Sequence, residues 1–284
     1  MHYCIGDVHG CYDELVALVN IIEERDKDAK IIFLGDFPDR GPKVWETLSW
    51  MLDHVFSDAR YQSIQGNHEQ MILQWYVKWI DWYKKQPLSS RVLGLSGPDE
   101  PRTNYDFYEV AKAHHALKPY TINKLMAAFI AMPFHITVEV PGKNGPVIYD
   151  IAHAWYTPSY PEDSYDQQMV NLWARKCDGN YENDHIIIHG HTPTITEAYA
   201  YDPDTAPGMI AYRKNAINID GGCVYRHLAP NFPCMLCAIC LETLEEIYPM
   251  SLEERMGEEK AARYRATFLN STSPFRQQML SLLP

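Results

Sequence analysis

The sequence predicts an α/β protein in which a mainly parallel sheet is followed by a second, mixed sheet. Short apolar runs alternate with helical patterns over the first 70 residues, and after Pro133 the chain turns to short runs separated by turns. Alternation of strands and helices is typical of parallel sheets, whereas closely spaced strands pair as hairpins. Clusters rich in Gly, Asp and His end the first three apolar runs, which suggests that function lies there.

The first 70 residues justify the parallel sheet. Apolar residues from Leu15 to Ile22 recur at helical spacing, and the wholly apolar run Lys30–Leu34 is typical of a buried parallel strand. Pro42 marks the start of a second expected helix. The expected order is strand His2–Ile5, helix, strand Lys30–Leu34, helix Val44–Phe56 and strand Arg60–Gln65.

Residues of about 70–131 read as a helical insertion. Helices are expected at Met71–Tyr83, Tyr105–Ala116 and Ile122–Ala131, with a Pro- and Gly-containing loop over 86–103. Trp75, Trp79 and Trp82 fall on one helical face, which indicates a core-facing stripe.

The second half carries the strands of the mixed sheet and a helical tail. The tail, about 251–284, begins with a charged amphipathic helix over Leu252–Phe268. Strands are expected at Phe134–Val140, Val147–Ala152, His185–Ile188, Ile195–Ala200, Ile210–Arg213, Ala216–Ile219, Met235–Leu241 and Glu245–Tyr248.

Composition excludes several classes of protein. The formal net charge is −12 in 284 residues, which argues against binding to nucleic acid or to an anionic membrane surface. No apolar run approaches the roughly 20 residues of a membrane-spanning helix, and the first residues show no signal peptide. Seven cysteines, an odd number, favour free thiols. We therefore expect a cytoplasmic protein.

Three polar clusters are expected to meet in space. They are GDVHG (Gly6–Gly10), GDFPDRG (Gly35–Gly41) and GNHE (Gly66–Glu69), separated by equal stretches, 11–34 and 42–65. Ligands bind at the carboxyl edge of parallel strands. Two further histidines, His153 and His191, also end predicted strands. Carboxylate, amide and imidazole groups without thiolates suit Mn, Fe or Zn, so the sequence predicts a metal site.

These motifs in this order resemble the phosphoprotein phosphatase family, within the calcineurin-like metallophosphoesterases. The resemblance rests on GDVHG, GDFPDRG, GNHE, the AHA histidine His153 and the GHT histidine His191. Within the family, bacterial and phage-type serine/threonine phosphatases have the most similar motif pattern. It implies one catalytic domain over residues 1–284, with two mixed sheets between helices (α/β/β/α), the insertion and the tail. It also implies two divalent metal ions, most simply Mn²⁺, with Fe or Zn as alternatives.

The resemblance implies a role for each motif residue. Asp7 and His9 bind the first metal, Asp36 bridges both, and Asn67, His153 and His191 complete the second. A hydroxide bridging the metals attacks phosphorus, His68 is the general acid, and Asp39 orients it. Arg40, Asn67 and, from the LWAR sequence, Arg175 bind the phosphate.

Three functions remain open. The first is a phosphomonoesterase acting on phosphoserine and phosphothreonine in proteins or peptides, and on small phosphate esters in vitro. The second is a symmetrical bis(5'-nucleosyl)-tetraphosphatase, because the segment GDVHGCYDEL resembles the start of those enzymes. Those enzymes typically lack the DRG aspartate and carry GNHD. This chain has Asp39 in that motif and Glu69 in GNHE, which favours the phosphatase. The third, a catalytically silent metal-binding scaffold, conflicts with the complete set of motif residues.

Two residues depart from the family's pattern. Pro38 stands before the DRG aspartate, where it removes a backbone donor without removing a ligand. His189 precedes the GHT motif, two residues before His191. It is a candidate outer or substitute ligand, while His191 stays the expected one.

Overall fold

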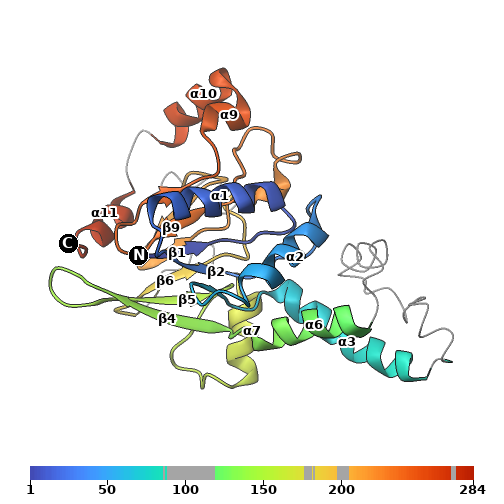
Figure 1. Ribbon diagram of the computed structural model, residues 1–284. Coiled ribbons are helices and arrows are strands. Elements are labelled where there is room, and N and C mark those ends of the chain that lie inside the picture. Colours follow the sequence, from blue (N-terminus) through green and yellow to red (C-terminus); the bar gives the residue numbers. More distant parts are fainter. Residues whose placement is uncertain (86, 88–118, 176–180, 182, 197–204, 270–272) are drawn as a thin grey trace.

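Two five-stranded sheets pack face to face at the centre of the molecule, a computed structural model shown in Figure 1. The structure describes residues 1–85, 87, 119–175, 181, 183–196, 205–269 and 273–284. The helix expected at Tyr105–Ala116, nearly all of the loop over 86–103 and most of the strand expected at Ile195–Ala200 lie outside these residues. Ile195 and Thr196, which are described, lie in a turn.

The first sheet has the order β10-β9-β1-β2-β3. Strands β1 (His2–Ile5), β2 (Lys30–Phe33) and β3 (Tyr61–Ser63) are parallel, as predicted. Helices α1 (Tyr12–Arg25) and α2 (Val44–His54) connect them, and α3 (Asn67–Lys84) follows β3.

The two late strands of the first sheet correct the sequence-based assignment. Strands β9 (Ala238–Cys240) and β10 (Glu246–Ile247) were expected in the second sheet, but β9 pairs antiparallel with β1 and β10 with β9. A local apolar pattern shows that a strand forms and does not select its partner, so this assignment was wrong.

The second sheet has the order β4-β5-β6-β8-β7. Its centre is parallel and both edges are antiparallel hairpins, so both sheets are mixed and the predicted fold class is confirmed. The strands are β4 (His135–Val140), β5 (Val147–Ala152), β6 (Ile186–His189), β7 (Ala211–Arg213) and β8 (Ala216–Asn218).

Alternating side chains divide the core into layers. In β1, Tyr3 and Ile5 pack with the helices while Cys4 packs between the sheets. In β6, Ile186 and Ile188 face the first sheet, and Ile187 faces Trp155 on the outer side. This period of two is what a strand buried on both faces requires.

The helices of the insertion and tail lie outside the sandwich. Helix α3 and α6 (Pro119–Ala131) run side by side away from the sheets (Figure 1). Trp75 and Trp79 are buried, which confirms that part of the expected aromatic stripe. The tail forms α9 (Leu252–Met256), α10 (Glu258–Phe268) and α11 (Pro274–Leu280). The single helix expected over Leu252–Phe268 is wrong, because Gly257 has φ of 82° and separates α9 from α10. Among the described residues, no helix is both long and apolar enough to cross a membrane.

Candidate metal centre

The three predicted clusters meet where β1, β2 and β3 end. They are joined there by His153, directly after β5, and by His191, two residues after β6. Two groups of side chains present metal-ligand atoms within 4.8 Å of one another: His9 with Asp36 and His68, and Asp7 with Asp36 and His153. Asp36 belongs to both groups, the position expected of a bridging ligand.

Asp36 contacts three of the other motif residues. Its Oδ2 lies 3.4 Å from His9 Nε2 and 3.5 Å from His153 Nε2, while Oδ1 accepts a 2.9 Å hydrogen bond from the His68 backbone. Burial alone would raise the pKa of Asp36, but the neighbouring histidines, His153 foremost, outweigh it and lower the pKa.

Asn67 connects the last two expected ligands. Its Oδ1 is 2.9 Å from His153 Nε2 and 2.9 Å from His191 Nδ1. Asn67, His153 and His191 therefore lie together, as the resemblance implied.

Burial opposes the charged form of His9, His153 and His191, and the neutral form of histidine is the one that binds metal. Burial lowers the pKa of His9 to about 3 and, together with the nearby His153, lowers that of His191 to about 2. The tautomers are set from outside the cluster. His9 Nδ1 lies 3.0 Å from the Pro38 carbonyl, and His153 Nδ1 lies 2.9 Å from the Leu34 carbonyl. Both Nε2 atoms are thereby left to face inward.

Two buried atoms without a hydrogen-bond partner show that the cluster fits a cation. They are Asp7 Oδ1 and His191 Nε2. Burial, with the carboxylates of Asp220 and Asp36 close by, raises the pKa of Asp7 well above its usual value. Buried carboxylates crowded in this way are stabilised by a bound cation.

His68 and Asp39 form a pair beside Asp36. His68 Nδ1 is 2.7 Å from Asp39 Oδ2, and its Nε2 is 3.9 Å from Asp36 Oδ2. Burial lowers the pKa of His68, but the charge of Asp36 and the bond to Asp39 outweigh this, so the pKa is raised. Pro38 therefore leaves Asp39 in reach of His68.

The two expected phosphate-binding arginines lie beside different residues of the cluster or their neighbours. Arg40 Nη1 is 2.8 Å from His9 Nε2, and its guanidinium lies 5.8 Å from the centre of the Tyr225 ring. Arg175 donates a 3.3 Å hydrogen bond to Thr192, next to His191. Binding of a metal by His9 Nε2 requires Arg40 to turn away from that atom.

His189 does not join the ligands. Its ring packs edge-on against Trp155, with centroids 5.1 Å apart, on the outer side of the second sheet. His189 ends β6 itself, whereas His191 lies past the strand end in a left-handed conformation, with φ of 66°.

Backbone strain is concentrated in this site. His9, Asp36, Asp39, Arg40 and His191 all have φ between 43° and 69°. Each such residue costs on the order of 1–3 kcal/mol and persists only where its surroundings enforce it. Glu69, to which no role was assigned from the sequence, supplies one such constraint: its buried carboxylate accepts hydrogen bonds from the backbone N–H groups of Asp36, Phe37 and Gly66 at 2.8–3.0 Å.

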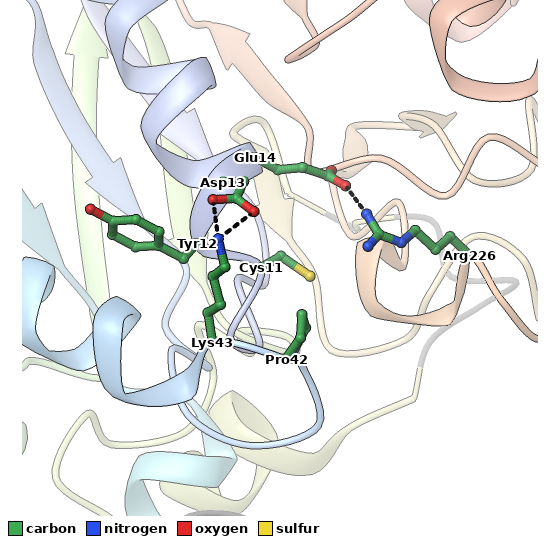
Figure 2. A pocket seen from close by; sticks show the side chains of 7 residues that line it. All are labelled: Cys11, Tyr12, Asp13, Glu14, Pro42, Lys43 and Arg226. Atoms are coloured by element: carbon green, nitrogen blue, oxygen red, sulfur yellow. Dashed lines mark hydrogen bonds and ion pairs between the residues drawn. The ribbon is translucent and has the colours of Figure 1, made fainter. Parts of the chain in front are cut away.

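Neither Asp220 nor the residues of the pocket in Figure 2 belong to the two ligand groups. Asp220 Oδ1 accepts a 2.9 Å bond from Gly222 N, consistent with a structural turn. Figure 2 shows a small pocket in which Lys43 pairs with Asp13 and Arg226 with Glu14. Both cations are thus matched by carboxylates. The pocket is lined by Cys11, Tyr12, Asp13, Glu14, Pro42, Lys43 and Arg226.

The chain belongs to the calcineurin-like phosphoesterase family, whose model matches residues 3–219. It is therefore a hydrolase of the metallophosphoesterase family, which uses divalent metals. A mutant of a cold-active protein tyrosine phosphatase has the same fold, with a TM-score of 0.50 at 15% identity, covering 88% of this chain and 80% of the other.

The relatives differ in substrate. An asymmetrical bis(5'-nucleosyl)-tetraphosphatase of Oceanobacillus iheyensis is 24% identical over 78% of this chain and 83% of its own. A symmetrical one of Neisseria gonorrhoeae is 40% identical over 25% of each chain. Serine/threonine-protein phosphatase 2 of Salmonella typhimurium is 28% identical over 61% of this chain and 67% of its own.

Proposed function

We propose that this protein is a metal-dependent bis(5'-nucleosyl)-tetraphosphatase. The observation that carries the proposal is the similarity to an asymmetrical tetraphosphatase over 78% of this chain, together with the 40% identity to a symmetrical one over 72 residues. These similarities support a tetraphosphatase, the second function that the sequence indicates, more strongly than a protein phosphatase, the first.

The proposed ligands are Asp7, His9, Asp36, Asn67, His153 and His191, with Asp36 shared between two divalent ions. The two groups around Asp36 supply His9, Asp7 and His153 of this set. Asn67 and His191 lie beside His153, and His68 of the first group is held by Asp39 and is kept as the proton donor. When bound, such a pair of ions activates a water molecule and stabilises the attacking and leaving oxygens of an in-line displacement. We propose Mn²⁺ as the ion, since the ligands are oxygens and imidazoles.

The arginines bind the substrate's phosphates. Arg40 and Arg175 reach the cluster from opposite loops, beside His9 and Thr192. Guanidinium groups make strong, charge-assisted bonds to phosphate oxygens. They hold the phosphate chain so that one phosphorus atom faces the ligand cluster.

His68 donates a proton to the leaving oxygen. Asp39 holds the protonated ring through Nδ1 at 2.7 Å, so that Nε2 carries the transferable proton toward the site. A nucleotide phosphate is a better leaving group than an alkoxide, so cleavage of an anhydride depends less on this proton than cleavage of a phosphoserine ester.

The His68–Asp39 pair favours a second candidate function, a protein serine/threonine phosphatase. An alkoxide leaving group needs a proton, and this pair is built to deliver one. The similarity to a serine/threonine-protein phosphatase over 61% of the chain adds to this. Phosphorylated proteins or peptides are then the partners.

One assay separates the two functions. The purified protein is supplied with Mn²⁺ and either diadenosine tetraphosphate or a phosphoserine peptide, and kcat/KM is measured for each. We expect the dinucleotide to be cleaved at least tenfold more efficiently, with two ADP showing symmetrical cleavage and AMP plus ATP asymmetrical cleavage. Faster hydrolysis of the peptide would overturn the proposal in favour of the phosphatase.

A further inference from the structure

Helix α7 (Tyr165–Trp173) carries a row of exposed apolar side chains that ends at the metal centre. Tyr165, Met169 and Trp173 recur every four residues, so they share one helical face. Their exposed fractions are 73%, 39% and 36%.

The opposite face of α7 is anchored beside the ligand His153. Gln167, Asn171 and Leu172 are buried, and the Asn171 carbonyl accepts a 2.7 Å hydrogen bond from Ala154 N. The helix is therefore held against the loop that carries His153. Its exposed row has a defined place relative to the metal centre.

Trp173 is the member of the row that reaches the centre. Its ring meets the His191 ring edge-on, with centroids 6.0 Å apart. Two residues later, Arg175 is exposed and bonds to Thr192. The exposed indole thus contacts the proposed metal ligand His191, whose neighbour Thr192 accepts a hydrogen bond from the proposed phosphate-binding residue Arg175.

We propose that Trp173 is a nucleobase subsite, on which one base of the substrate stacks while its phosphates occupy the metal centre. This rests on the proposed dinucleoside polyphosphate substrate. Two features support this occupant. The subsite is continuous with the phosphate-binding arginine, and a planar indole that is partly exposed offers the stacking surface that bases require. Such stacking is tolerant of base identity, so Trp173 distinguishes nucleotides from base-free phosphates rather than adenine from guanine.

The test compares two substrates in two Trp173 variants and one control. Diadenosine tetraphosphate and inorganic tripolyphosphate both contain phosphoanhydride bonds, and the second has no base. In Trp173→Ala we expect the ratio of kcat/KM on the dinucleotide to that on tripolyphosphate to fall about 5- to 150-fold, the equivalent of about 1–3 kcal/mol of stacking. Trp173→Phe keeps an aromatic face and restores most of the ratio. Tyr165→Ala lies on the same face about 12 Å along the helix and leaves the ratio at its original value.

A binding measurement separates this proposal from the proposed function. AMP and ribose 5-phosphate are compared by equilibrium dialysis against the Mn²⁺-loaded protein, without any need for turnover. In the original protein we expect AMP to bind more tightly than ribose 5-phosphate. In Trp173→Ala we expect the two ligands to bind equally well. Both results hold even if the dinucleotide proves a poor substrate.

Three results would overturn the subsite. An unchanged substrate ratio in Trp173→Ala would mean that the indole only supports His191. Equal affinity for AMP and ribose 5-phosphate in the original protein would mean that no base is bound. If Trp173→Ala, assayed also on the phosphoserine peptide, loses kcat/KM on that peptide alone, the surface binds a peptide instead.

Discussion

Gly190→Ala tests whether the orphaned oxygen of Asp7 is a metal ligand. Gly190 lies between His189 and His191, and a Cβ placed there would sit 2.2 Å from Asp7 Oδ1. Ordinary contacts of a Cβ begin at 3.4 Å, so the oxygen or the backbone has to move by about 1.2 Å. Metal sites tolerate changes in ligand distance of only about 0.2 Å. The new methyl group therefore removes a ligand without altering any titratable side chain.

Gly190→Ala should lower the affinity for metal strongly and the free energy of unfolding only modestly. We expect Mn²⁺ affinity, measured by isothermal titration calorimetry, to fall at least about tenfold, with a matching loss of activity at low metal concentration. Overpacking should lower the free energy of unfolding of the metal-free protein by about 1–3 kcal/mol, measured in urea with EDTA.

Gly145→Ala is the matched control. It adds the same methyl group where nothing lies within 4 Å, but at φ of 130°, so it strains the backbone between β4 and β5. We expect it to cost stability and to leave Mn²⁺ binding intact. Wild-type Mn²⁺ affinity in Gly190→Ala would refute the assignment of Asp7 as a ligand.

Three further predictions concern the acid, the phosphate site and the pH dependence of folding. His68→Asn should lower kcat on a phosphate ester about 10²- to 10⁴-fold while metal content stays the same; loss of metal would instead make His68 a ligand. Arg175→Ala should raise KM for a small phosphate ester, and kinetics identical to the parent would remove Arg175 from the site. Asp150→Asn should lower the free energy of unfolding by about 2 kcal/mol at pH 7. Although burial raises the pKa of Asp150, its interactions with His135, Tyr181 and His185 outweigh burial and lower the pKa to about 2. This stabilisation is present above pH 4 and is lost as pH falls toward 2. In urea titrations, the difference in free energy of unfolding between the parent and Asp150→Asn should therefore be smaller below pH 4 than at pH 7. An equal difference at both pH values would contradict the reasoning.

The positions of the first three strands and the convergence of their motifs were predictable because they depend on local pattern. A wholly apolar run such as Ile31–Phe33 forms a buried strand wherever it lies, and parallel strands joined by helices end at one edge. Convergence of Asp7, Asp36 and Asn67 follows from that topology alone. The structure places all three as expected.

Other features depended on contacts between distant parts of the chain. The partner of β9 was assigned to the wrong sheet, since the pairing with β1 joins residues more than 230 positions apart. The two GHT-region histidines could not be separated by spacing. A single turn of the backbone sends His191 to Asn67 and leaves His189 against Trp155.

The sequence by itself determined the chemistry of the site: which carboxylates, amides and imidazoles are present and which strand each one follows. Tertiary structure alone decided the conformations that make them useful. The left-handed backbone at His9, Asp36 and His191 is unfavourable locally. It is held by distant groups such as the Glu69 and Asp7 carboxylates, which accept hydrogen bonds from the backbone N–H groups of Asp36 and His191. The place of Trp173 beside His191 likewise follows from the docking of α7 on the His153 loop, which is a contact between segments that no local pattern records.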